Sequence, residues 1–138
     1  MSLIATARSM PGTLRQEVVI DGKHRLTTDQ PEQHGGEGGG PSPHELFPAA
    51  LAACISTTLT MYARTKGWEL GGVTVDVEYD NHASPRHVEM VIRLGGALTE
   101  EQLERLRKVA RACPLRRSIE TGFEFAERIE APVRGGVA

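Results

Sequence analysis

The stretch GGGPSPHELFPAALAACISTTLTMYARTKG, residues 38–67, predicts the longest helix of the chain. Ser42 is a favoured N-cap, Pro43 suits the first helical position, and Glu45 completes an S-x-x-E capping box. The glycine that closes the stretch is expected to end the helix at residue 66. Pro48 removes one backbone donor and is expected to bend the helix, which the helix-forming residues after it should sustain.

Short segments on both sides of this helix have the composition and alternation of β-strands. The expected strands cover residues 4–8, 14–20, 23–28, 73–79, 87–94 and 124–130. Asp21 and Gly22 form a two-residue hairpin signal between the second and third strands. A second helix is expected to begin after a Thr99 cap, with Gln102 as its capping-box partner, and to stop at Pro114.

This order of elements predicts an α+β fold in which helices cover one side of an antiparallel sheet. The chain of 138 residues is expected to form a single domain over residues 1–131, followed by a disordered tail at 132–138. The long apolar helix is hard to cover in a monomer of this size, so we expect a homodimer that shares it.

The bulk composition excludes several classes of partner. A net charge of -2 and an aromatic content of 4% provide neither electrostatic attraction to nucleic acid nor stacking platforms for it. Residues 1–12 lack the pattern of a signal peptide, and we expect no apolar stretch long enough to span a bilayer. The sequence therefore predicts a cytoplasmic protein, whose two cysteines should not form a permanent structural disulfide in that reducing compartment.

The two cysteines occupy apolar settings far apart in the chain. Cys54 lies in mid-helix among alanines, and Cys113 ends an apolar stripe of the second expected helix. Small thiols in such settings are most often core filler. If both stripes instead face one pocket, the thiols are candidates for a redox pair in which Cys54 attacks and Cys113 resolves. Cys113 lies at a helix C-terminus, where the dipole disfavours a thiolate, and Cys54 needs a nearby cation or hydrogen-bond donor to react.

Metal and phosphate sites are not expected. The five histidines show no i,i+4 pair, and no C-x-x-C accompanies them, so neither a metal nor a cofactor is predicted. The glycine-rich loop before the long helix lacks the Lys-Ser/Thr ending of a P-loop. We interpret this loop as a hinge or as the rim of an active site.

Three quoted stretches together resemble a known family. They are GGGPSPHELFPAALAACISTTLTMYARTKGWEL at 38–70, ACPLRRSIE at 112–120 and DGKHRLTTDQP at 21–31. The G-P-S-P-x-E-L…A-A-x-A-A-C block and the late C-P pair are similar to those of the OsmC/Ohr family, which comprises osmotically inducible protein C and organic hydroperoxide resistance proteins. The third stretch resembles the third-strand segment of that family, so the resemblance covers nearly the whole chain and is identified with the OsmC-like branch.

This resemblance implies an OsmC-like α+β fold, an intertwined homodimer and active sites at the subunit interface. It also implies a peroxidase that reduces organic hydroperoxides and is itself reduced by a dithiol of the lipoyl type. Cys54 matches the peroxidatic cysteine of the family, and Cys113 matches the resolving one. A Cys54 thiolate would attack the peroxide, become a sulfenic acid and condense with Cys113 to a disulfide.

One position departs from the pattern of the hydroperoxide-resistance branch. That branch has a glutamate ten residues before the peroxidatic cysteine, where this chain has His44, and Glu45 follows one residue later. On a straight helix His44 lies about 80° around the axis from Cys54 and Glu45 about 180°. His44 is therefore either an activating group or an exposed first-turn residue, and Glu45 is expected to act as a cap.

The family also implies an arginine from the N-terminal strands, and three residues compete for that role. Arg8 lies near the first turn, Arg15 follows that turn, and Arg25 matches the OsmC-like branch by local sequence. Two other functions stay open. One is a dimer that binds a small molecule without redox turnover, and the other is a structural dimer with inert thiols.

Overall fold

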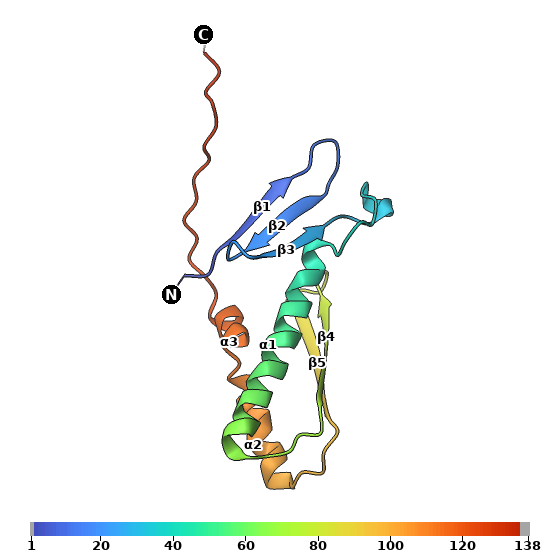
Figure 1. Ribbon diagram of the computed structural model, residues 1–138, viewed down its shortest axis with the longest axis vertical. Coiled ribbons are helices and arrows are strands. Elements are labelled where there is room, and N and C mark those ends of the chain that lie inside the picture. The colour runs from blue at the N-terminus through green and yellow to red at the C-terminus, as the bar shows by residue number, and fades with distance from the viewer. Residues whose placement is uncertain (1, 136–138) are drawn as a thin grey trace.

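The computed structural model describes residues 2–135 and has an α+β fold (Figure 1). Its elements follow the chain in the order β1 (Ala5–Ser9), β2 (Gln16–Ile20), β3 (His24–Thr28), a 3-10 turn η1 (Glu32–His34), α1 (Pro43–Lys66), β4 (Val73–Asp80), β5 (His87–Leu94), α2 (Glu100–Arg111) and α3 (Pro114–Thr121). The predicted fold class is thus confirmed, and the first five predicted strands are present with boundaries shifted by at most two residues.

The strands form two separate antiparallel sheets. One sheet has the order β1-β2-β3, and the other is the β4-β5 hairpin. Between β2 and β3 the amide of Lys23 donates to the carbonyl of Ile20 at 3.0 Å. Asp21 and Gly22 both have positive φ, at 53° and 64°, which is the mirror-image turn that suits a two-residue hairpin. The hairpin predicted at this dipeptide is confirmed.

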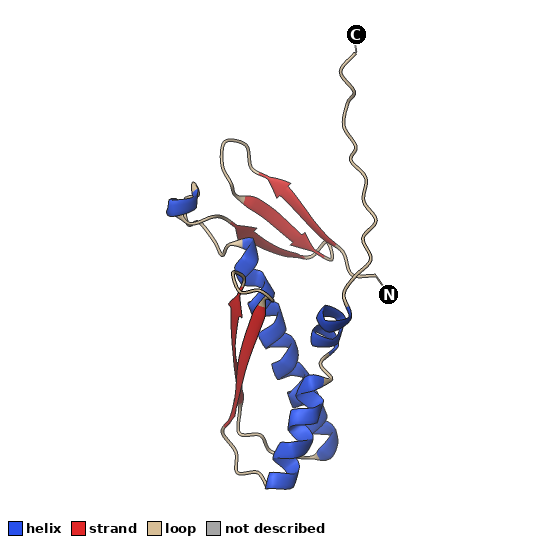
Figure 2. Ribbon diagram, turned by 180° about the vertical axis from the view of Figure 1, so that it is seen from behind, coloured by secondary structure: helices blue, strands red, loops and turns tan. Residues whose placement is uncertain are grey.

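Helix α1 is the centre of the protomer. It lies between the β4-β5 hairpin on one side and α2 and α3 on the other, and its N-terminal end meets the three-stranded sheet (Figures 1 and 2). Its buried side chains recur every four residues and form one stripe along the helix: Leu51, Ile55, Leu59 and Ala63. Each large aliphatic side chain in this stripe contributes about 1.5–3 kcal/mol through removal from water.

The predicted start and end of α1 and the predicted start of α2 are confirmed, whereas α2 ends at Arg111, before the predicted stop at Pro114. The Glu45 carboxylate accepts a hydrogen bond from the Ser42 amide at 3.0 Å, and Gly67 ends α1 in the left-handed conformation. At the start of α2, Thr99 and Gln102 cap each other through hydrogen bonds of 2.9 and 3.1 Å. Helix α1 continues through Pro48 without interruption.

The sequence predictions for the C-terminal region were wrong in two respects. A third helix, α3, begins at Pro114, where the sequence predicted only a stop. Residues 124–130 form no strand, because no strand edge of the described chain lies beside them, and Phe125 and Ile129 are 89% and 96% exposed. Of the tail predicted at 132–138, residues 136–138 lie outside the described residues.

The expectation that no stretch is apolar enough to span a membrane was also wrong. Helix α1 reaches a mean hydropathy of 1.5 over 18 residues. Core helices of soluble proteins pass the same test, and α1 packs its buried stripe against β4, α2 and α3. Its other face remains exposed, notably at Ala53, Thr57 and Met61.

The glycine-rich loop before α1 is held by a buried carboxylate. Asp29 is 1% exposed and accepts hydrogen bonds from three amides and one guanidinium: those of Gly39 (2.9 Å), Gln30 (2.8 Å), Glu37 (3.2 Å) and Arg15 (3.3 Å). The Gly39 amide is the main cause that lowers the pKa of Asp29, and the other donors add to it against the opposing effect of burial. The loop is therefore a fixed structure built around one carboxylate.

Close backbone contacts explain why this loop needs glycine. A Cβ atom added at Gly40 would lie 2.2 Å from the carbonyl oxygen of Thr27, and one at Gly36 would lie 1.9 Å from that of Gln30. Because both obstacles are backbone atoms, no side-chain rotation can relieve the overlap.

We predict that Gly40→Ala lowers the free energy of unfolding by about 1–3 kcal/mol, as overpacking usually does. Urea unfolding followed by circular dichroism measures the change. Gly135→Ala is the control, since a Cβ there meets nothing within 4 Å. Equal stabilities of the two variants would contradict the close-contact explanation.

Candidate functional site

The fold brings the two cysteines together. Their sulfur atoms lie 3.1 Å apart and share a hydrogen bond, although 59 residues separate them in the chain. Cys113 is completely buried, whereas Cys54 is partly exposed, and both thiols are free. The proximity that a redox pair requires is therefore present within one protomer.

Helix packing produces this contact. Leu106, Ala110 and Cys113 form a buried stripe that continues from α2 to the start of α3. The stripe belongs to the same core cluster as Ile55 of α1, the residue after Cys54. Since the apolar stripes of both segments must face each other to leave water, the two thiols that lie on or beside them are brought into contact.

Cys113 lies between two helices: it follows the C-terminal end of α2 and directly precedes α3. It is the N-cap residue of α3, with Pro114 in the first turn. Burial opposes ionisation of its thiol. The amide of Arg116, the thiol of Cys54 and the amide of Leu115 outweigh burial, so that the pKa of Cys113 is lowered. The expectation that a helix dipole disfavours this thiolate was wrong, because the start of α3 faces the sulfur.

Cys54 has the opposite electrostatic setting. Burial raises the pKa of its thiol, and the neighbouring Cys113 raises it further. The Leu115 amide and the Thr58 hydroxyl favour the thiolate but do not outweigh these effects, and no arginine is among the causes of the shift. Of the two thiols, Cys113 is therefore the one whose surroundings favour the thiolate more.

His44 and Glu45 lie away from the thiols, in the first turn of α1. His44 is exposed. The Glu45 carboxylate caps the helix, and its hydrogen bonds with the amide and hydroxyl of Ser42 lower its pKa. Glu45 precedes Cys54 by nine residues, which is two and a half helical turns. The structure thus gives Glu45 a capping position, as the helical geometry predicted.

The three candidate arginines all belong to the region of the three-stranded sheet. Arg25 pairs with Glu17 at 2.9 Å, and Arg15 pairs with Asp29 at 3.3 Å. Arg8 forms no salt bridge with any residue in the described range 2–135. The sheet meets the N-terminal end of α1 (Figure 1), and Cys54 lies eleven residues further (54 − 43), or about 16 Å along the axis. The protomer thus does not bring these arginines to the thiols.

An apolar cleft lies close to the thiol pair. It measures about 210 Å³, and its lining combines aliphatic and aromatic side chains with two arginines and a glutamate: Phe47, Leu51, Val88, Met90, Ile119, Arg86, Arg116 and Glu120. Leu51 is one helical turn before Cys54, and Arg116 is three residues after Cys113. The cleft is thus formed by the two elements that carry the sulfurs, together with β5.

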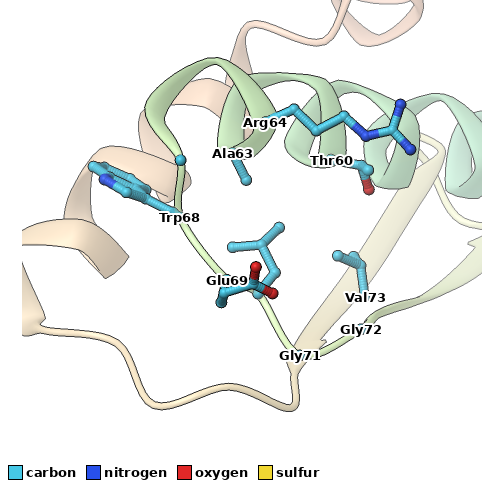
Figure 3. A pocket seen from close by; sticks show the side chains of 10 residues that line it. Thr60, Ala63, Arg64, Trp68, Glu69, Gly71, Gly72 and Val73 are labelled. Carbon is cyan, nitrogen blue, oxygen red and sulfur yellow. The ribbon is translucent and has the colours of Figure 1, made fainter.

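A larger hollow of about 440 Å³ lies at the other end of α1 (Figure 3). Arg64, Trp68 and Glu69 surround it, and the Gly71 and Gly72 backbone closes one side. No residue of α3 lines this hollow, whereas the smaller cleft is lined by residues of both elements that carry the sulfurs. We therefore place the chemistry at the thiol pair.

Three groups that act on the sulfurs were not identified from the sequence. These are the amides of Leu115 and Arg116, together with Thr58, whose hydroxyl also donates to the carbonyl of Cys54 at 2.8 Å. One signal was available. Proline is common at the first position of a helix, so that Pro114 indicates the start of a helix as well as the end of one.

Comparisons with known proteins find similarity over most of the chain. A family model described as OsmC-like protein matches residues 36–128. An osmotic stress induced and detoxification response protein of Psychrobacter arcticus is 25% identical, with a TM-score of 0.69 over 82% of this chain and 85% of that chain. The organic hydroperoxide resistance protein OsmC of Legionella pneumophila is 26% identical, with a TM-score of 0.62 over 86% and 89%.

A third similar structure is an organic hydroperoxide resistance protein of Vibrio cholerae with captopril bound in one of its active sites. It is 25% identical, with a TM-score of 0.60 over 85% of this chain and 83% of that chain. A search of curated protein sequences found no match.

The pKa shift of Cys113 gives a prediction for the variant Cys54→Ser. The remaining thiol should ionise below the ordinary pKa of a thiol, as followed by its ultraviolet thiolate absorbance. Ionised Cys113 then stabilises the fold above the unfolded-state pKa, and this contribution is lost as pH falls through the lowered pKa. A pKa at or above the ordinary value would show that burial dominates and would contradict the role of the α3 amides.

Proposed function

Because this chain belongs to the OsmC-like protein family, which includes proteins named for organic hydroperoxide resistance, we propose that it is a cysteine-based peroxidase that reduces organic hydroperoxides. The observation that supports this proposal most strongly is the 3.1 Å separation of the Cys54 and Cys113 sulfurs beside an apolar cleft. A pair of free thiols in contact can pass from dithiol to disulfide with a small movement of the side chains.

The exposures of the two sulfurs support distinct roles for them. Cys54 is the more accessible sulfur and attacks the terminal oxygen of the hydroperoxide, releasing an alcohol and leaving a Cys54 sulfenic acid. A Cys113 thiolate lies in hydrogen-bond contact, takes the proton that Cys54 gives up and passes it to the departing alkoxide, which leaves as the alcohol. The Cys113 thiolate then attacks the sulfenic sulfur, hydroxide leaves and takes a proton from solvent, and the Cys54–Cys113 disulfide forms.

The lining of the cleft favours an organic substrate. Phe47 and Leu51 offer apolar contact area one to two turns before Cys54 on α1, and Met90 of β5 adds to the same wall. Such a wall binds an alkyl or aryl group but gives nothing to hydrogen peroxide. We propose that a dithiol of the lipoyl type restores the two thiols and that the protein acts in oxidative-stress defence in the cytoplasm.

A homodimer completes the proposal. The protomer exposes 11069 Å², whereas a compact monomer of 15.0 kDa exposes about 7,000 Å². The difference is about 4,000 Å² for one protomer, or about 8,000 Å² for two, which lies above the usual 2,000–5,000 Å² of obligate homodimers and leaves ample surface for an extensive interface. The exposed face of α1 and the extended apolar segment that includes Phe125 and Ile129 are the surfaces that a second copy would cover.

The same dimer can supply a cation to the thiol pair. Among the three candidate arginines, Arg15 and Arg25 are engaged with acidic partners within the protomer. Arg8 lies exposed on β1 without a salt bridge in the described residues. We therefore favour Arg8 as the residue that approaches Cys54 of a second copy and stabilises its thiolate.

Peroxide turnover tests the proposed activity. With dihydrolipoamide as reductant, the protein should consume cumene hydroperoxide with a higher kcat/KM than hydrogen peroxide. Cys54→Ser should lower the rate at least about 1,000-fold, because it removes the nucleophile. Thr65→Ser, an exposed position near the end of α1, is the control variant. If Cys54→Ser keeps wild-type activity, Cys54 is not the nucleophile and the proposed mechanism is contradicted. If no organic hydroperoxide turns over while an apolar ligand binds the cleft, a non-catalytic binding dimer is the better description.

The oligomeric state has a separate test. Sedimentation equilibrium should give about twice the chain mass of 15.0 kDa at micromolar concentration. Met61→Glu on the exposed face of α1 should shift the equilibrium towards the monomer, since a buried unpaired charge is costly. A monomer for the unmodified chain would contradict the dimer and remove Arg8 from the site.

A further inference from the structure

We infer that the reductant attacks Cys54 of the disulfide and that Cys113 departs as a thiolate, held at the N-terminus of α3. The family assignment suggests a thiol pair, but it does not say which sulfur is the electrophile in the reducing step. This inference depends on the proposed function only for the chemical class of the reductant, which is a thiol.

The first argument is accessibility. Thiol–disulfide exchange requires the incoming thiolate to reach the sulfur that it attacks. Cys113 is 0% exposed, whereas the Cys54 side chain is partly exposed and lies one turn from the cleft at Leu51. An incoming thiolate therefore meets the sulfur of Cys54 first, with Cys113 beneath it.

The second argument is the quality of the leaving group. Exchange is faster when the departing sulfur is the more stable thiolate. The amides of Arg116 and Leu115 act on Cys113 at the start of an eight-residue helix, together with the side chains of Cys54 and Thr58. Cys54 lies in the middle of α1, where its own helix provides no free amide.

The electron balance of the step is complete. One thiolate of the dithiol attacks Cys54 and forms a mixed disulfide with it, while the electron pair of the broken bond moves to Cys113. The second thiol of the reductant then displaces Cys54 as the reductant closes to its cyclic disulfide, and Cys54 takes up a proton. Access and leaving-group stability thus both favour attack of the reductant on Cys54. Cys113 is the leaving sulfur in the reducing step and the resolving sulfur in the oxidising step.

Trapping of the mixed disulfide tests this direction. The protein is oxidised with diamide, so that the test does not depend on peroxidase activity, and is then mixed briefly with glutathione. The reaction is quenched in acid, the free thiol is alkylated with N-ethylmaleimide in denaturant, and the peptides are mapped by mass spectrometry. We expect glutathione on Cys54 and maleimide on Cys113, in at least tenfold excess over the reverse pattern.

The reverse pattern, or equal amounts of both patterns, would overturn the inference and leave the peroxidase proposal intact. Absence of peroxide turnover would overturn the peroxidase proposal and leave this inference intact.

The variant Arg117→Gln is the matched control, because this exposed arginine lies in the first turn of α3, outside the cleft lining, and the substitution keeps every backbone amide. Its labelling pattern and its rate of reduction by glutathione should stay within about twofold of the unmodified protein. A tenfold slower reduction would show that a guanidinium charge at the start of α3 holds the thiolate and would overturn the role of the backbone amides.

Discussion

The apolar stripe of α1 is the constraint on which the rest of the structure depends. Leu51, Ile55 and Leu59 are almost fully buried, and no other single element buries as many large side chains in the described residues. The stripe determines which face of α1 meets the stripe of α2 and the start of α3. Cys54 lies at the edge of the first stripe and Cys113 at the end of the second, so the packing that stabilises the fold also sets the distance between the two sulfurs.

The chemistry of the pair follows from its asymmetric surroundings. The Cys54 side chain can be reached, but its thiolate is stabilised too little to offset burial. The Cys113 thiolate is stabilised by the start of α3, but its sulfur cannot be reached. A peroxidatic sulfur has to be reached by its substrate, and a leaving sulfur has to be stable as a thiolate. The two requirements are met on two different residues, which explains why one of the thiols can be completely buried and still take part in turnover.

The parts of the structure that follow from local signals could be predicted from the sequence. The helix from Pro43 to Lys66 is an example, since its cap, its proline and its final glycine lie within the segment itself. The Asp21–Gly22 hairpin is another, because its conformation depends on two residues. The contact of the sulfurs could only be raised as a possibility, since it depends on the packing of helices whose cysteines are 59 residues apart.

The predictions that were wrong concern segments whose structure depends on neighbouring elements, which a local sequence pattern does not reveal. Pro114 was interpreted as the end of α2, although it also begins α3, and this interpretation reversed the expected electrostatics of Cys113. The alternating residues 124–130 have the pattern of a strand, but a strand needs an edge to pair with, and the described protomer offers none beside them. The activating arginine could not be chosen for the same reason, because none of the three candidates contacts the pair within one chain.

The most direct test of the central claim, that these two sulfurs act as one redox unit, is the intact mass of the protein after one equivalent of cumene hydroperoxide. The account predicts a loss of two hydrogens in the unmodified protein. In Cys113→Ser it predicts the gain of one oxygen on Cys54, and in Cys54→Ser it predicts no change. Gain of oxygen without loss of hydrogen in the unmodified protein, or oxidation of Cys54→Ser at the same rate, would contradict it.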